Sequence, residues 1–271
     1  MLEFIECIRS VFLGIVEGIT EWLPISSTGH MILVNEFMGN DSSFTSSDLY
    51  LYVIQLGAIL AVVTIFFKKL NPFSLSAGKE ERKRTWQLWS KIIVACIPAA
   101  VIGLALDDLM DRIENWQVVS AMLIIYGIAF IIIERIGKKA TITSLDDISY
   151  TTALKIGAFQ VLSIVPGTSR SGATILGGML VGCSREIAAE FAFFLAIPVM
   201  AGVSLIKIAK NIDMLTAPNL LVLLIGMAVA YVVSLASIRF LMKFVKSHSF
   251  TAFGIYRIVL GIAVILCLGV L

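Results

Sequence analysis

The chain has 271 residues, of which 58% are hydrophobic and only 15% charged, and its net charge is +2. Soluble domains are about half apolar and about a quarter charged, so this composition excludes an ordinary soluble domain and indicates a polytopic helical membrane protein. The small net charge, with no basic stretch interleaved with aromatic residues, means that we expect no nucleic acid as a partner.

The first apolar segment, residues 4–33, is interrupted by Pro24 and by the polar sequence at 26–30. Irregular backbone at membrane depth is tolerated only inside protein or beside a wet cavity. We therefore predict a re-entrant helix pair here rather than a simple span. Residues 35–49 are predicted to form a polar loop, and residues 50–67 an uninterrupted transmembrane span.

Basic residues indicate which loops face the cytoplasm. The loop that follows the span 50–67 holds a dense basic group: Lys68, Lys69, Lys79, Arg82, Lys83, Arg84 and Lys91. A span over 91–106 then leads to a predicted acidic loop at 107–111 on the opposite side. A span over 117–133 returns the chain to the cytoplasmic side, where the polar linker 135–151 begins.

The second half repeats the order of the first. Residues 157–174 again run as apolar helix, proline, turn rich in glycine and hydroxyl groups, and apolar helix. Three spans are predicted to follow, over 186–206, 219–238 and 252–271, with basic residues marking one more cytoplasmic loop. The alignment of the two halves, with a one-residue gap, pairs Gly14 with Gly157, Glu17 with Gln160, Pro24 with Pro166 and Ser27 with Ser169.

We therefore predict an all-α polytopic membrane protein with an inverted-topology repeat, about six transmembrane helices and two re-entrant helix pairs. It forms a single integral membrane domain, residues 1–271, built of repeats at about 1–134 and 152–271 that the cytoplasmic linker 135–151 joins. Inverted repeats place broken helices tip to tip near the bilayer midplane, where ligands bind. The alternative is a chance resemblance between two turns that both contain proline and glycine.

Ionisable residues within the two interrupted segments are the candidate functional residues, because buried charge in a membrane protein is expensive. Glu17 and Glu21 are four residues apart, so a helix places both on one face. They are predicted either to hold a divalent cation, Mg²⁺ or Ca²⁺, together with substrate phosphates, or to supply a general base. A structural role that caps the facing turn is the third possibility.

Arg170 lies in a glycine-flanked turn between two serines and opens a new apolar helix. Its planar fork suits phosphate oxygens, and the backbone N–H groups at a helix start also favour an anion. The alternative is a structural salt bridge to Glu17 or Glu21, and both states are compatible in the ligand-free protein. Ser27 and His30, three residues apart, are predicted to act as nucleophile and as base or acid.

Gln55, a lone amide on a predicted span, is either a substrate contact or a helix–helix hydrogen bond. Together these groups predict an anionic lipid headgroup as the substrate and phosphoryl transfer to water as the reaction. The predicted substrate-binding residues are Glu17, Ser26, Thr28, Gly29, Gln55, Gly167, Thr168, Ser169, Ser171, Gly172 and Thr174.

The segments 17–30 and 166–174 resemble the two signature regions of the undecaprenyl-diphosphatase family, also called the bacitracin-resistance family, and the resemblance covers the whole chain. It implies hydrolysis of undecaprenyl diphosphate in the bacterial cytoplasmic (inner) membrane, which recycles the lipid carrier for cell-wall synthesis. It also implies a multi-pass inverted-repeat fold with an active site open to the outer face, a need for a divalent metal and often a homodimer. Its important residues fall on Glu17, Glu21, Ser27, His30, Ser169 and Arg170.

The predicted mechanism has Arg170 and a metal held by the two glutamates clamp the diphosphate. Ser27 then attacks the terminal phosphorus while His30 or Glu21 handles its proton, and water releases phosphate. The motif itself leaves open whether Ser27 or His30 forms the bond to phosphorus. Two other classes compete with this hypothesis. An acid-phosphatase-like lipid phosphatase needs a second catalytic histidine, and His248 in a basic loop is the only other one. A transporter or flippase of the lipid carrier also fits the inverted repeat and the charges at the bilayer midplane.

Overall fold

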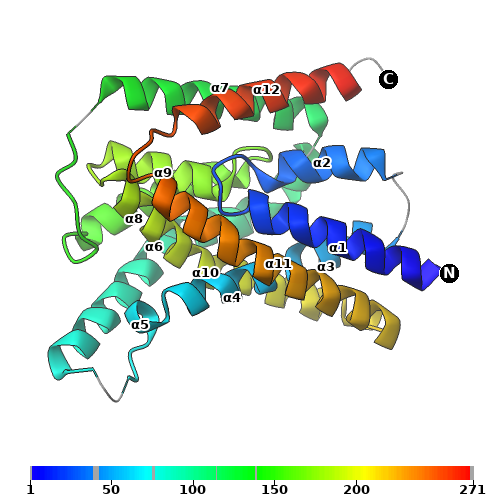
Figure 1. The fold of residues 1–271 in the computed structure, drawn as a ribbon, viewed down its shortest axis with the longest axis horizontal. Helices are drawn as coiled ribbons and strands as arrows, with labels where there is room; N and C mark the ends of the chain where they lie inside the picture. Colours follow the sequence, from blue (N-terminus) through cyan, green and yellow to red (C-terminus); the bar gives the residue numbers. More distant parts are fainter. Residues whose placement is uncertain (1, 39–42, 75–76, 114, 138, 269–271) are drawn as a thin grey trace.

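The computed structural model describes residues 2–38, 43–74, 77–113, 115–137 and 139–268, and these fold into helices joined by short connections (Figure 1). Parts of the predicted loop 35–49, of the linker 135–151 and of the last span lie outside the described residues. The α-helices are α1 (Leu2–Thr20), α2 (Ser27–Phe37), α3 (Asp48–Val53), α4 (Gln55–Ile65), α5 (Phe67–Leu70), α6 (Lys79–Ile113), α7 (Trp116–Ile136), α8 (Tyr150–Val161), α9 (Arg170–Leu180), α10 (Arg185–Lys210), α11 (Ala217–Phe244) and α12 (Thr251–Leu268). Three short 3-10 helices, η1 (Phe44–Ser46), η2 (Leu162–Ile164) and η3 (Ile212–Met214), complete the secondary structure.

Six segments of the described chain are long and apolar enough to cross a membrane, as the sequence predicted. They are Asp48–Ile65, Lys79–Gly103, Trp116–Ile136, Arg185–Lys210, Ala217–Phe244 and Thr251–Leu268. The all-α polytopic fold class is therefore confirmed. The first of these segments is not one helix, because α3 and α4 meet at a break at Ile54.

The predicted acidic loop at 107–111 is wrong, because α6 continues without interruption through Ile113. The reason is local: the aspartates are separated by Leu109 and Met110, which are good helix formers, and no glycine or proline follows Gly103 within the helix. The predicted loop rested only on the charge of the three aspartates, and charged residues alone do not terminate a helix.

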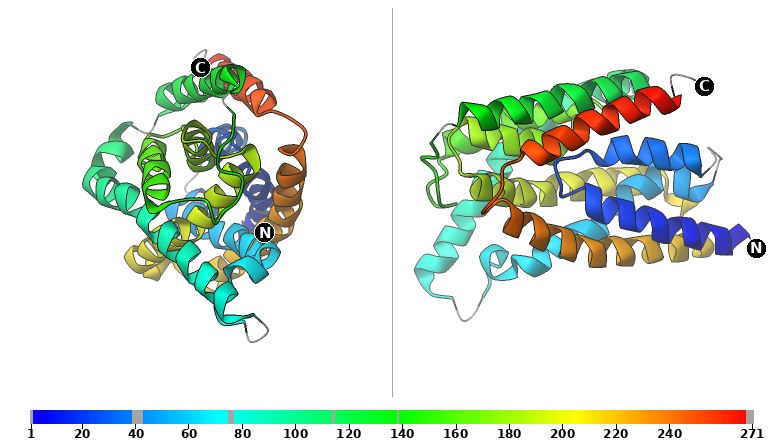
Figure 2. Two further views of the ribbon diagram at one scale, coloured as in Figure 1. Left: turned by 90° about the vertical axis from the view of Figure 1, so that its left-hand side faces the viewer. Right: turned by 45° about the horizontal axis from the view of Figure 1, so that its top comes forward.

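The two interrupted segments enter the bundle from opposite ends. We call them the first broken segment, residues 2–37, and the second broken segment, residues 150–180. In Figure 2 the first broken segment lies at the end that holds both chain termini, whereas the second one follows the connector 139–149 at the other end. Their two turns, at 21–26 and 165–169, therefore approach each other inside the molecule.

The helices pack in a reciprocal pattern. α1 packs along α11, its counterpart α8 packs along α6, and α7 packs along α12. A glycine permits the close approach in each half: a Cβ at Gly14 would lie 2.7 Å from the Gly226 oxygen, and one at Gly157 would collide with the Ala95 oxygen. This exchange of partners is what an inverted repeat requires, and it supports the predicted division into two halves, which stays a prediction.

We expect the substitution Gly157→Ala to lower the free energy of unfolding by about 1–3 kcal/mol, because the new methyl group forces α8 away from α6. The thermal unfolding midpoint of the purified protein in detergent measures this effect. Gly202→Ala is the matched control, since a Cβ there meets no atom within 4 Å. Equal midpoints for the two variants would show that this close approach does not support the fold.

Candidate active site

The two turns are built alike. Ser26 and Ser169 have φ angles of 73° and 72°, in the left-handed region that residues other than glycine rarely occupy. Each serine precedes a helix and accepts a hydrogen bond at its Oγ from the backbone N–H three residues on, over 3.3 Å from Gly29 and 3.2 Å from Gly172. Strained backbone of this kind concentrates at functional sites, and it occurs here in two matching places.

This match corrects the predicted alignment of the halves by one residue. Because Ser26 and Ser169 hold the same backbone position, no gap is needed, and Ser27 lies opposite Arg170 rather than opposite Ser169. Each of the two helices thus begins with a residue of different chemistry. The first half presents a hydroxyl at this position, and the second half presents a guanidinium.

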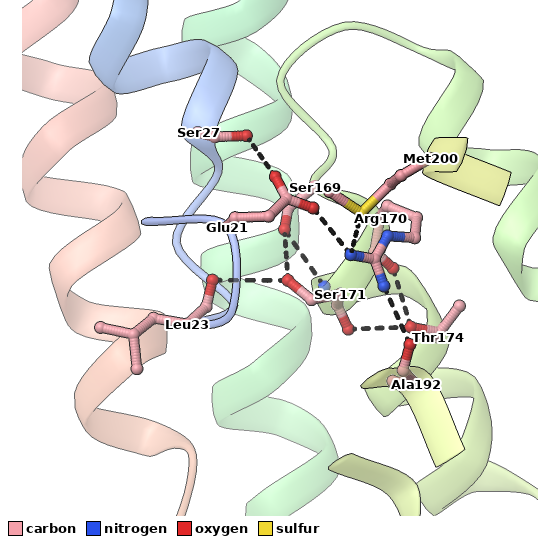
Figure 3. Close-up of polar contacts among 10 residues, drawn as sticks. Glu21, Leu23, Ser27, Ser169, Arg170, Ser171, Thr174, Ala192 and Met200 are labelled. Carbon is pink, nitrogen blue, oxygen red and sulfur yellow. Dashed lines mark hydrogen bonds and ion pairs between the residues drawn. The ribbon is translucent and has the colours of Figure 1, made fainter. Parts of the chain in front are cut away.

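Glu21 joins these two helix starts (Figure 3). Its Oε1 accepts a hydrogen bond of 2.7 Å from Nη2 of Arg170, and its Oε2 accepts one of 3.0 Å from the hydroxyl of Ser27. Glu21 is 8% exposed, so this ion pair is protected from water. The Glu21 carboxylate therefore binds both the Ser27 hydroxyl, the predicted nucleophile, and the Arg170 guanidinium, which is predicted to bind phosphate.

The rest of the Arg170 guanidinium is partly satisfied by the protein. Nη1 donates to the carbonyl of Ala192 at 2.9 Å, and Nη2 also lies 3.2 Å from the sulfur of Met200. The guanidinium stands 5.8 Å from the ring of Trp22, which is fully buried. The Nε–H has no partner among the described residues, so it remains available to an oxygen of a bound anion.

A second buried arginine, which the sequence reasoning missed, fixes the two turns to each other. Arg257 on α12 is 0% exposed. Its Nη2 donates to the carbonyls of Gly167 and Thr168 at 2.9 Å each, and its Nη1 donates to the carbonyl of Pro24 at 3.2 Å. Arg257, like Arg170, is a charged residue within an apolar segment, so the high cost of burying charge in a membrane is the sequence signal that identifies it.

Buried polar atoms without a hydrogen-bond partner gather at this site. Among the described residues they are Glu17 Oε1, Trp22 Nε1, both amide atoms of Gln160, Thr168 Oγ1, Arg170 Nε, Ser234 Oγ and Arg257 Nε. All but the Ser234 atom belong to the two broken segments or to the arginine that ties their turns together. Native proteins leave few such atoms unpaired, so a cluster of them indicates groups that serve a ligand.

The other predicted residues of the second turn lie in the same network. Ser171 Oγ is 3.1 Å from Ser169 Oγ and donates to the carbonyl of Leu23 across the junction at 3.4 Å. Thr174 Oγ1 donates to the carbonyl of Arg170 at 2.8 Å and so stabilises the first turn of α9. Gly167 has a φ of 88°, which suits glycine and brings the turn against Val119.

Two of the predicted substrate-binding residues lie at the edge of this network. Thr28 lines a cavity of about 500 Å³ beside the turns. Gln55 is half-buried at the start of α4, and among the described residues no hydrogen bond joins it to either turn. Its role stays a prediction.

His30 is directed away from Ser27. Its Nδ1 lies 2.7 Å from the carbonyl of Ser26, and its Nε2 lies 2.7 Å from the hydroxyl of Tyr256 on α12. A carbonyl can only accept, so Nδ1 carries a hydrogen. The structure thus pairs Ser27 with Glu21, not with His30. His248 is exposed at the far end of α11 and stacks on Phe244, so it offers no second catalytic histidine.

The acidic side of this site offers carboxylate oxygens of the kind that a divalent cation binds. Glu17 is 1% exposed and its Oε1 has no partner among the described residues, and the charges of Glu21 and Arg170 both act on it. Among the described residues no group of three or more His, Cys, Asp or Glu side chains is arranged to hold a metal. Two carboxylates supplemented by phosphate and water are the usual surroundings of Mg²⁺ at phosphate sites.

Comparison with known proteins gives a consistent result. The family model described as Bacitracin resistance protein BacA matches residues 10–263. The chain is 54% identical over 269 residues to an undecaprenyl-diphosphatase of Desulfitobacterium hafniense, covering 98% of this chain and 97% of that one. It is 54% identical over 270 residues to one of Enterococcus faecalis, with 98% of both chains covered. It is 55% identical over 267 residues to one of Streptococcus thermophilus, with 96% and 93% covered.

Proposed function

Because this chain belongs to the bacitracin resistance protein BacA family, we infer that the junction of its two turns is a phosphatase site for undecaprenyl diphosphate. The protein is an undecaprenyl-diphosphatase, a membrane enzyme that releases inorganic phosphate and leaves undecaprenyl phosphate. The family name implies a role in bacitracin resistance. One geometric observation carries the proposed mechanism: a single carboxylate, Glu21, binds both the Ser27 hydroxyl and the Arg170 guanidinium.

In the first step, Arg170 binds the terminal phosphate through its Nε–H and the Nη2 that Glu21 occupies in the free protein. Oγ of Ser27 attacks the terminal phosphorus and its proton passes to Oε2 of Glu21. The bond between that phosphorus and the bridging oxygen breaks, and the bridging oxygen leaves with undecaprenyl phosphate. Such transfers depend mainly on positioning and on neutralising charge, which this arrangement provides.

In the second step, water attacks the phosphorus now bound to Ser27. The bond between the phosphorus and Oγ breaks, Oγ recovers the proton from Glu21, and inorganic phosphate leaves. His30 then has a positioning role, since it binds the Ser26 carbonyl and fixes the turn that presents Ser27.

Glu17 and Glu21 are the residues that would hold a divalent cation, Mg²⁺ or Ca²⁺. When bound, such a cation supplies positive charge that stabilises the negative charge on the transferring phosphate. Glu17 suits this task because its buried oxygen has no partner among the described residues.

We place the protein in the bacterial cytoplasmic membrane with the site open to the outer face. Helix α5 and the start of α6, which are rich in lysine and arginine, lie at the end of the bundle opposite to both termini, and the positive-inside rule assigns that end to the cytoplasm (Figure 2). The cavity beside Thr28 extends to Lys207 and Lys210 at the C-terminal end of α10, on the outer side. We also propose a homodimer, as the family resemblance implies.

A transporter or flippase of the polyprenyl phosphate carrier is the second candidate function. One observation favours it: a second cavity of about 660 Å³ lies at the cytoplasmic end, where Lys69 and the buried Glu190 form an ion pair of 2.6 Å. Cavities at both ends of reciprocally packed halves are what alternating access requires. This activity would move the lipid without releasing phosphate.

The test is phosphate release from undecaprenyl diphosphate by the purified protein in detergent, with added Mg²⁺, with added Ca²⁺ and with a chelator. We expect release with a divalent cation and a loss of at least about tenfold with the chelator. Equal rates with and without the chelator would remove the cation from the account. A folded protein that binds the lipid but releases no phosphate with either cation would instead support the transporter.

A further inference from the structure

Gln160 is a buried amide that nothing in the fold explains. It lies on α8 with 1% of its surface exposed, and its backbone carbonyl accepts hydrogen bonds from the hydroxyl of Ser163 at 2.7 Å and from the backbone N–H of Leu162. Neither the Nε2 nor the Oε1 of its side chain has a hydrogen-bond partner among the described residues. It is the one side chain of the described chain whose two polar atoms are both buried and unpaired.

An unpaired amide at this depth is costly, because both its donor and its acceptor have lost water and gained nothing. A leucine of similar size would fill the same space without that cost. The amide therefore has a use only when a polar group from outside the chain reaches it.

The surroundings of Gln160 show where that group comes from. Gln160 is one of the residues that line the 500 Å³ cavity, together with Thr28 at the start of α2. Most of the remaining wall is apolar, and it includes Pro166 of the second turn. The cavity thus extends from Thr28 and Pro166, beside the two turns, past Gln160 to Lys207 and Lys210 at the outer end.

The counterpart of Gln160 in the other half indicates the charge of the missing group. With Ser26 opposite Ser169 and no gap, Gln160 lies opposite Glu17. The negative charge of Glu17 suits the binding of a cation. A second carboxylate, at position 160, would repel a phosphate. A neutral amide at this position keeps a donor and removes the repulsion.

We propose that Gln160 is a substrate-binding residue whose Nε2–H donates to an oxygen of the diphosphate, while its Oε1 accepts from a water molecule held at the same place. This inference rests on the proposed function, since the anion it binds is the diphosphate of that reaction. It adds a contact from the second half of the chain that the two signature segments do not contain.

The test compares Gln160→Leu with the wild-type protein in two measurements. The first is the thermal unfolding midpoint in detergent, without ligand, with farnesyl diphosphate as a short prenyl diphosphate probe, and with farnesol. The second is the KM for phosphate release from undecaprenyl diphosphate. We expect the midpoint without ligand to be unchanged or higher, because the leucine removes an unpaired polar group. The KM should rise about tenfold to a hundredfold, as expected for a lost hydrogen bond to a charged group.

Comparing farnesyl diphosphate with farnesol shows whether Gln160 contacts the phosphate groups or the prenyl chain. The upward shift of the midpoint with farnesyl diphosphate should shrink in Gln160→Leu, and the shift with farnesol should not. A KM within a factor of two of the wild-type value would overturn the proposal. So would a fall in the ligand-free midpoint with an unchanged response to farnesyl diphosphate, because it would show a purely structural role.

Two further arms keep the result decisive. The glutamate side chain in Gln160→Glu has the same shape as the native glutamine but carries a negative charge. This variant should therefore weaken farnesyl diphosphate binding more than Gln160→Leu does. If Gln160→Glu binds farnesyl diphosphate as strongly as wild type, the proposal is overturned, even if the leucine variant does not fold. If wild type responds to farnesyl diphosphate but releases no phosphate, the phosphatase function fails while a lost response in Gln160→Leu still supports the contact.

Discussion

Replacement of Arg170 by alanine should lower kcat/KM for phosphate release by at least about a thousandfold, the range seen when an arginine that neutralises a transferring phosphate is removed. Two losses combine in this variant. The terminal phosphate loses the free Nε–H, and Glu21 loses the cation that now holds its Oε1 at 2.7 Å. The initial rate at several concentrations of undecaprenyl diphosphate, with purified protein in detergent, measures the effect.

Arg170→Lys is the matched control for charge. A lysine keeps the positive charge, but its three donors sit on one nitrogen and cannot reproduce the spread of the fork, which contacts the Ala192 carbonyl and Glu21 while Nε stays free. We therefore expect this variant to recover only a small part of the activity. Full recovery would show that charge alone matters, and an alanine variant within tenfold of wild type would remove Arg170 from the site. The unfolding midpoint of both variants shows whether the lost ion pair also costs stability.

Replacement of Ser27 by alanine should lower kcat by about ten-thousandfold or more, because no other group takes over a lost nucleophile. The neighbouring serine supplies the control. Ser26 is fully buried and its Oγ accepts from the N–H of Gly29 as a cap of α2. Ser26→Ala should therefore cost about 1 kcal/mol of stability and reduce kcat far less than Ser27→Ala does.

The pair of serine variants also separates Ser27 from His30 as the attacking group. Similar kcat values for Ser26→Ala and Ser27→Ala would mean that the hydroxyl held by Glu21 is not the nucleophile. His30→Ala would then be expected to abolish activity. If Ser27→Ala and His30→Ala both retain activity, the covalent mechanism is wrong.

The parts of this account that the sequence predicts are those that depend on the cost of burying charge. Six spans follow from apolar length, and the structure confirms them. Glu17, Glu21 and Arg170 stand out because they lie in apolar segments, and the structure brings Glu21 and Arg170 into contact although 149 positions separate them. The turns that contain proline and glycine correctly indicated where the helices break.

The parts that the sequence does not predict depend on contacts between distant helices or on local backbone. The equivalence of Ser26 and Ser169 became evident only from their φ angles, because proline spacing alone favoured a one-residue gap. The partner of His30 lies on α12, 226 positions away, so sequence spacing favoured the nearer Ser27. The residues at 107–111 show that charge in a short stretch does not mark the end of a helix.

The most direct test of the central claim, that Ser27 forms a covalent bond to the transferred phosphorus, is the stereochemical course at that atom. The substrate would be undecaprenyl diphosphate with a terminal thiophosphate made chiral by heavy oxygen isotopes, and the water would carry the remaining isotope. The account predicts retention of configuration in the released thiophosphate, because attack by Ser27 and attack by water each invert the phosphorus once. Inversion would contradict it, since it would mean that water attacks the diphosphate directly.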